Sequence, residues 1–191
     1  MKEKSVKFNF IMNIVLTMSN FIFPLITFPY VSRILLPIGT GKVAFATSIV
    51  TYFSMFAQLG IPTYGIRVCA QVRDDKEKLS RTVQELLGIS IWTTAAAYLL
   101  FFIGLWTVPR MRADKTLFLI VSTMILFNSI GMEWLYKGLE EYSYITIRSI
   151  IVKIISAGAM FLLVKSKEDY VIYGGISIFA SSASNVLNFM N

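Results

Sequence analysis

Residues 13–36 read NIVLTMSNFIFPLITFPYVSRILL, a nearly continuous apolar stretch that contains Pro24 and Pro29 and includes Arg33 close to its end. At about 1.5 Å per residue, a helix from residue 10 to residue 34 is long enough to cross a hydrocarbon core of roughly 30 Å. The stretch therefore predicts a membrane span near the N-terminus.

The two prolines give this span its particular character. Each proline removes a backbone donor and presses its ring against the carbonyl four residues earlier, which predicts a kinked helix. Within a membrane the freed carbonyls need partners from neighbouring helices, water or hydroxyl groups, so we expect the helix inside a bundle, beside a wet cavity. Pro24 and Pro29 then either mark a gating element or belong to a kinked helix that only packs. Nearby polarity comes from Thr17, Ser19, Asn20 and Thr27.

The composition of the whole chain fits a membrane protein. Of 191 residues, 55% are hydrophobic, and the charged residues fall between the apolar blocks. Histidine is absent and Cys69 is the single cysteine, which disfavours metal chemistry and excludes an internal disulfide. The net charge of +7 lies in short loops, where it indicates topology and contact with anionic lipid, not with nucleic acid.

Apolar blocks recur along the chain and predict a single all-α transmembrane domain over residues 1–191, a polytopic bundle of six helices. A Pro/Gly-rich link at 35–42 is expected to end the first helix. The expected spans are about 10–34, 43–66, 85–108, 116–136, 145–164 and 171–190.

Basic residues are distributed unevenly between the two sides of such a bundle. With the N-terminus inside, 11 of the 18 Lys and Arg residues fall on the cytoplasmic side, which favours cytoplasmic N- and C-termini. The most basic link, residues 67–85, contains Leu79, Val83 and Leu86 at helical spacing. The link is either a short interfacial helix or a solvated charged loop.

Glu133 lies in the apolar register of the fourth block and is the candidate for ion coupling, because ionisable groups inside a membrane are costly and commonly functional. Lys137 lies four residues later, in the favourable order for an ion pair on a helix. Trp134 and Tyr136 also suggest a position at the interface. A purely structural pair is therefore the alternative interpretation.

Two cations lie within the fifth block. Arg148 and Lys153 are about 140° apart around a helix, so they cannot share one face. Arg148 is most simply a topological anchor, whereas Lys153 either extends outward to the interface or faces a polar cavity. The sixth block is rich in small residues, Gly174 and Gly175 among them, which permit close helix packing.

The chain offers no pattern for nucleophilic catalysis, metal binding or nucleotide binding, so we expect neither an enzyme nor a cofactor. Cations at Arg33, Arg67, Arg148 and Lys153 near or within the apolar register suit a cargo that carries phosphate. Arg33 has an equally simple alternative role, as a marker of the outer interface.

A resemblance to a known family rests on three stretches of sequence. FPLITFPYVSRIL, YFSMFAQLGIPTYGIR and the region GMEWLYKGLEEYSYITIRSIIVKIISAGAMFLLVKSKEDYVIY resemble the O-antigen and capsular polysaccharide flippases (Wzx-type). These flippases belong to the multidrug/oligosaccharidyl-lipid/polysaccharide exporter superfamily. The resemblance covers essentially the whole chain.

The resemblance implies a flippase of the bacterial cytoplasmic membrane that moves undecaprenyl-pyrophosphate-linked oligosaccharide units by alternating access. Arg33 would contact the head group, with Lys153 and Arg148 as weaker candidates, Glu133 would couple an ion gradient, and the Pro24–Pro29 helix would be the gate. Expected partners are lipid-linked oligosaccharide, membrane lipids and polysaccharide polymerase machinery.

Members of this family have two six-helix lobes, and this sequence resembles one. We therefore expect a second lobe or a homodimer partner to complete the cavity. Alternatives are a peptidoglycan-precursor flippase, a drug exporter of the same superfamily, and a membrane scaffold or decayed half-protein that carries nothing.

Overall fold

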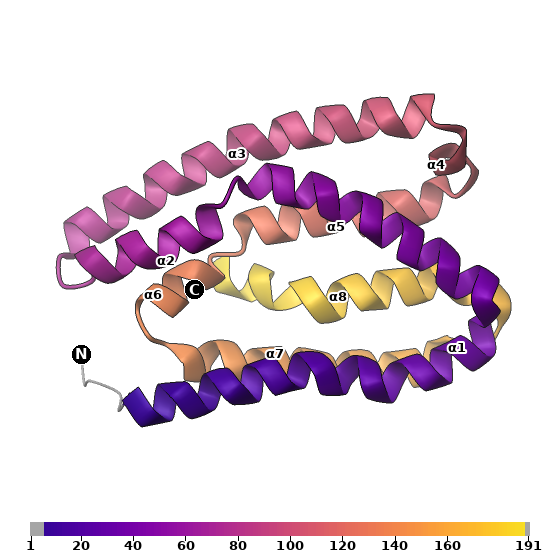
Figure 1. The fold of residues 1–191 in the computed structure, drawn as a ribbon, viewed down its shortest axis with the longest axis horizontal. Helices are drawn as coiled ribbons and strands as arrows, with labels where there is room; N and C mark the ends of the chain where they lie inside the picture. The colour runs from indigo at the N-terminus through magenta and orange to yellow at the C-terminus, as the bar shows by residue number, and fades with distance from the viewer. Residues whose placement is uncertain (1–5, 190–191) are drawn as a thin grey trace.

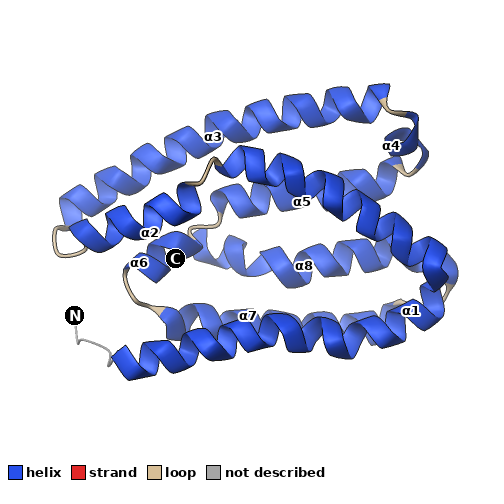
Figure 2. Ribbon diagram, in the orientation of Figure 1, coloured by secondary structure: helices blue, strands red, loops and turns tan. Residues whose placement is uncertain are grey.

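The computed structural model describes residues 6–189, and these residues form helices joined by short links, with no strand among them (Figures 1 and 2). The predicted all-α class is therefore confirmed. The helices are α1 Val6–Gln58, α2 Ile61–Val72, α3 Lys76–Thr107, α4 Pro109–Ala113, α5 Lys115–Ile130, α6 Glu133–Gly138, α7 Tyr142–Leu163, the 3-10 helix η1 Lys167–Asp169, and α8 Tyr170–Phe189.

Four helical stretches of the described chain are long and apolar enough to cross a membrane. The first of them contains a sharp turn, and α8 is a further helix of 20 residues outside the four. The number of six spans therefore remains a prediction. The four stretches are Lys7–Val72, Lys76–Thr107, Lys115–Gly138 and Tyr142–Leu163.

Helix α1 folds back on itself at one residue, Leu36, whose backbone is non-helical (φ 60°, ψ 174°) (Figure 1). Leu36 precedes Pro37, and a residue before proline is disfavoured in helical geometry, whereas proline is well suited to begin a helix. We call residues 6–35 the first arm and residues 37–58 the second arm. The turn expected within 35–42 is therefore present, but the expected length of the link is wrong, because the chain is helical on both sides of this single residue.

The backbone keeps helical torsion angles at Pro24 and Pro29, and the sharp change of direction in α1 lies at Leu36. Close to the turn, Gly39 lets the helices approach. A Cβ added there would lie 3.0 Å from the Leu35 Cβ and 3.6 Å from the Tyr170 Cβ. The turn therefore places the start of the second arm directly against the start of α8.

The first arm and α7 lie side by side and run in the same direction (Figure 1). Three hydrogen bonds join residues that are 134 positions apart, so one register holds along the whole contact. The bonds run from the Thr146 hydroxyl to the Met12 carbonyl (3.1 Å), from Lys153 Nζ to Ser19 Oγ (2.7 Å), and from the Tyr30 hydroxyl to the Val164 carbonyl (3.1 Å). We call this contact the α1–α7 seam.

The second arm packs with α3 and α5 around the largest apolar core, and α8 lies between that group and the seam (Figure 1). A Cβ on Gly174 of α8 would lie 2.7 Å from Leu117 Cδ1 of α5. The predicted close approach through small residues is confirmed at this position. Fully buried members of the core include Phe101, Phe118, Ile125, Val50 and Val121.

Two helices that were expected to be continuous are broken at the same end of the bundle. Leu59 (φ 43°) and Gly60 (φ 76°) separate the second arm from α2, and Gly131 separates α5 from α6. The expected blocks 43–66 and 116–136 are therefore each divided. Beyond the breaks α2 packs on α6, where a Cβ on Gly65 would lie 2.6 Å from the Trp134 ring.

The basic segment 67–85 is mostly helical, so the alternative of a solvated loop is wrong. Helix α2 continues to Val72, and α3 begins at Lys76 and runs without interruption into the third apolar block. Leu86 is buried against α2, with Leu79 and Val83 partly buried beside it. The amphipathic segment is the first part of the spanning helix.

Two carboxylates fix links outside the spanning segments. Asp75 caps α3 by accepting the Lys78 N–H (3.1 Å), which lowers the pKa of the Asp75 carboxyl. Asp169 accepts the N–H groups of Lys165 (2.9 Å) and Ser166 (2.8 Å), and these bonds lower the pKa of its carboxyl in the same way. Both links are therefore held by charged groups at ordinary pH.

Candidate functional site

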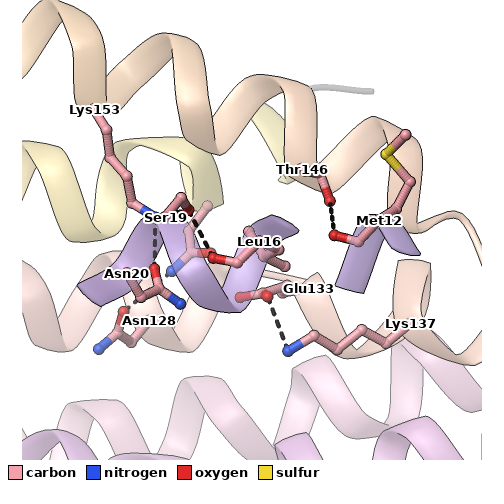
Figure 3. Close-up of polar contacts among 10 residues, drawn as sticks. Met12, Leu16, Ser19, Asn20, Asn128, Glu133, Lys137, Thr146 and Lys153 are labelled. Atoms are coloured by element: carbon pink, nitrogen blue, oxygen red, sulfur yellow. Dashed lines mark hydrogen bonds and ion pairs between the residues drawn. The ribbon is translucent and has the colours of Figure 1, made fainter. Parts of the chain in front are cut away.

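A cation lies inside the α1–α7 seam. Lys153 is only 8% exposed, and its Nζ donates to Ser19 Oγ at 2.7 Å and to Asn20 Oδ1 at 2.5 Å (Figure 3). The Lys153 ammonium thus lies among polar groups inside the bundle and does not extend outward to the interface.

No carboxylate of the described chain lies within ion-pair distance of Lys153. Glu133 instead pairs with Lys137 at 2.9 Å, and Figure 3 shows its carboxylate turned to that lysine. This is the ion pair on one helix that the sequence offered as the alternative role of Glu133. The Lys153 ammonium is hydrogen-bonded only to neutral oxygens and has no direct ion-pair partner among the residues described. The site can therefore attract an anion.

Pro24 contributes to the polarity of this turn of the first arm. Because proline has no N–H, the backbone carbonyl of Asn20 lacks its helical donor. Ser19 Oγ donates to the Leu16 carbonyl at 2.6 Å, which orients the hydroxyl oxygen toward Lys153. The turn before Pro24 thus offers oxygen atoms to a cation where an ordinary helix would not.

An apolar groove of about 440 Å³ runs along the outside of the seam. Lys153, Ser19 and Thr27 are its polar members. Their polar atoms contribute almost nothing to the groove surface, so walls of this kind match an acyl or polyprenyl chain. The remaining lining residues are apolar: Val15, Met18, Ile22, Phe23, Ile26, Ile150, Ile154 and Ala157.

A cluster of amides and hydroxyls lies at the broken end of α5. Asn128 donates to Ser54 Oγ (3.1 Å) and accepts from Asn185 Nδ2 (3.1 Å), which connects α5, the second arm and α8. Gln58 donates to the same serine at 3.1 Å. Gln58, Asn128 and Asn185 also border a pocket of about 200 Å³, together with Glu133.

Arg148 lies against two aromatic rings. Its guanidinium carbon is 3.9 Å from the ring centroid of Tyr144 and 5.6 Å from that of Tyr136. The three guanidinium nitrogens are buried and lack a hydrogen-bond partner among the described residues. Cation–π attraction therefore takes the place of an ion pair here.

Arg33 lies apart from these groups. It is exposed on the first arm close to the turn, about 20 Å along the helix axis from Asn20 at 1.5 Å per residue. The structure brings Lys153 together with Ser19 and Asn20, but does not bring Arg33 to them. In the described part of the chain, no group of three or more His, Cys, Asp or Glu side chains converges as a metal site would require.

Several contacts were not anticipated from the sequence. Tyr144 lies four residues before Arg148, a spacing that could have indicated their contact. The contact of Ser54 with Asn128 offered no comparable signal, because the two residues are 74 positions apart in sequence.

The long apolar helices define a multi-pass helical membrane protein. Residues 6–190 match the model of a family described as polysaccharide biosynthesis protein, and the chain belongs to this family of polysaccharide and O-antigen flippases. The resemblance stated from the sequence is confirmed.

Two curated relatives share the name "Putative O-antigen transporter". The protein from Escherichia coli (strain K12) is 25% identical over 169 residues, which are 88% of this chain and 41% of the relative. The protein from Shigella dysenteriae is 26% identical over 153 residues, covering 80% of this chain and 38% of the relative. The chain thus spans about two-fifths of the length of these relatives. No solved structure matches it.

The Lys153 site predicts a coupling between the ammonium and Asn20. Asn20→Leu removes an acceptor from a buried cation and should lower the free energy of unfolding by about 1.5–3 kcal/mol. In the Lys153→Met background, Asn20→Leu should lower the free energy of unfolding far less, because no ammonium is left to solvate. Unfolding can be followed in detergent by the reaction of a thiol dye with the buried Cys69.

Asn13→Leu is the matched control, since Asn13 is exposed on the same arm. Additive effects of Asn20→Leu and Lys153→Met would contradict the assigned contact.

Proposed function

We propose that the chain is one lobe of a flippase that moves undecaprenyl-pyrophosphate-linked oligosaccharide units across the bacterial cytoplasmic membrane for polysaccharide biosynthesis. Membership of the polysaccharide biosynthesis family and the names of the two relatives support an export role at this level. The observation that carries the proposal is Lys153, a buried cation without a carboxylate partner, on the wall of an apolar groove.

The pyrophosphate would replace or join the neutral oxygens of Ser19 and Asn20 around the Lys153 ammonium. Charge-assisted hydrogen bonds to phosphate oxygens are stronger than those to a hydroxyl or an amide. The polyprenyl chain would remain along the apolar groove, exposed to lipid. Arg33 and Arg148 are further head-group candidates, at the two ends of the first arm and α7.

Transport would proceed by alternating access, with the cavity closed by a second lobe or by a second copy of this chain. The first arm would be the gate, because Pro24 and Pro29 weaken its backbone ladder between the seam contacts at Asn20 and Tyr30. Glu133, adjacent to the break at Gly131, would couple an ion gradient through its pair with Lys137.

A cationic-drug exporter is a poorer match for the same geometry. Such a protein would need a carboxylate facing the groove, and the groove residues of the described chain include a lysine but no acid. A scaffold that carries nothing would not need a buried ammonium held by neutral oxygens, which is costly to keep in an apolar environment.

Binding of undecaprenyl pyrophosphate to the chain in lipid nanodiscs tests the proposal. Lys153→Met should weaken binding about 10- to 100-fold, because a hydrogen-bonded charge contributes about 1.5–3 kcal/mol. Lys153→Arg should retain most of the affinity. Undecaprenol, which lacks the pyrophosphate, should bind weakly to every variant.

Lys167→Met is the control, because Lys167 is exposed in the link before α8. Wild-type affinity in Lys153→Met, or equal binding of undecaprenol and undecaprenyl pyrophosphate, would contradict the proposal.

We also propose that both termini face the cytoplasm. The α2–α3 link and α6 lie at one end of the bundle, and the turn of α1, α4 and η1 lie at the other (Figure 1). The first end contains the most basic segment, and basic segments remain cytoplasmic. Lys2 and Lys4, which also support this orientation, lie outside the described residues.

Single cysteines in a Cys69→Ser background test the orientation. In spheroplasts, Lys167→Cys should react with an impermeant maleimide, whereas Lys78→Cys should react only after the membrane is permeabilised. The reverse pattern would mean that the termini face outward.

A further inference from the structure

A second cavity lies between the two arms of α1, near the turn at Leu36. Its volume is about 620 Å³, and its walls come from both arms and from α8. It is separate from the Lys153 groove, since the two share no lining residue. Hydroxyl-bearing side chains dominate the polar part of its lining, among them Thr47, Ser48, Thr51, Tyr52, Tyr173 and Ser177.

Most of these hydroxyls have no hydrogen-bond partner in the described part of the chain. Thr51 donates to the carbonyl of Thr47, one turn earlier in its own helix, at 2.7 Å. Among the described residues, the hydroxyls of Ser48, Tyr52 and Ser177 make no hydrogen bond that the structure records. The cavity therefore presents several donors and acceptors to whatever fills it.

The hydroxyls occupy one face of the second arm, and the opposite face forms the core. Val43, Ala46 and Val50 point into the apolar core, although Val43 also borders the cavity. Unpaired hydroxyl groups are unfavourable against hydrocarbon, so a face built in this way suits water or a polar ligand better than lipid tails.

The cavity contains no Asp, Glu, Lys or Arg side chain. Its aromatic members, Phe28, Tyr52 and Tyr173, offer flat apolar surfaces beside the hydroxyls. A ligand matched to these walls is rich in hydroxyl groups, has apolar C–H faces and carries no charge. These are the properties of a neutral sugar ring.

We infer that this cavity binds an uncharged saccharide, the part of the cargo that follows the pyrophosphate; the inference rests on the proposed function. Phe28 lies eight residues after Asn20, a rise of about 12 Å along the axis of the first arm, so the Lys153 site and the cavity lie on successive stretches of one helix. The hydroxyl face would select neutral sugars, because an acidic sugar would lose water here without gaining a cation.

Three lipids separate this inference from the proposed function: undecaprenyl pyrophosphate, the same lipid carrying a disaccharide of neutral hexoses, and the same lipid carrying a disaccharide that contains a uronic acid. For the wild-type chain in nanodiscs, the neutral disaccharide should increase affinity about tenfold over the sugar-free lipid, and the acidic one should increase it less. Each hydrogen bond to a hydroxyl group should increase the binding affinity about two- to tenfold.

The variant Thr47→Val/Ser48→Ala/Thr51→Val should lose the gain from the neutral disaccharide and keep wild-type affinity for the sugar-free lipid. Tyr52→Leu provides a second variant that is safe for folding, since Tyr52 is 71% exposed. Thr107→Val is the control, because Thr107 bonds only to its own helix, at the end of α3.

Wild-type preference for the neutral disaccharide in both cavity variants would overturn the saccharide site, as would equal affinity of the wild type for neutral and acidic disaccharides. If the affinity for the sugar-free lipid does not depend on Lys153, the proposed function is overturned instead. The two results come from different lipids and different variants, so they can be told apart.

Discussion

The ε-ammonium group of Lys153 must be solvated inside an apolar pair of helices, and the α1–α7 seam is arranged around this requirement. Lipid tails offer a buried cation no hydrogen-bond acceptor, so the first arm supplies Ser19 and Asn20. Pro24 leaves the Asn20 carbonyl without a helical donor in the same turn. The register of the seam, and hence the position of the first arm against α7, follows from these contacts.

The turn at Leu36 gives the lobe its second feature, an opening between two arms of one chain. Because helix resumes at Pro37 without a loop, the arms diverge from a fixed point and enclose the hydroxyl-lined cavity against α8. The first arm thus borders an apolar groove with Lys153 of α7, and the second arm presents uncharged hydroxyls. A cargo with a lipid chain, an anionic group and sugars contains the matching parts in the same order.

Local sequence patterns were sufficient for the fold class, for the family and for the polar turn around Ser19 and Asn20. They also indicated the Glu133–Lys137 pair, because both residues lie on one helix face. They failed where two segments distant in sequence decide the outcome. The need for a glycine at 131 depends on Asn185, which occupies the space of a Cβ, and the partner of Lys153 depends on the register of α7.

The most direct test of this account is the register of the seam, measured by disulfide cross-linking in native membranes with Cys69→Ser. The pair Met12→Cys and Thr146→Cys should cross-link faster than a pair out of register, because the helices run parallel and the Thr146 side chain contacts the backbone of Met12. The pair Met12→Cys and Ile150→Cys, one turn out of register, should cross-link more slowly. Faster cross-linking of the second pair would remove Lys153 from Ser19 and Asn20 and contradict the account.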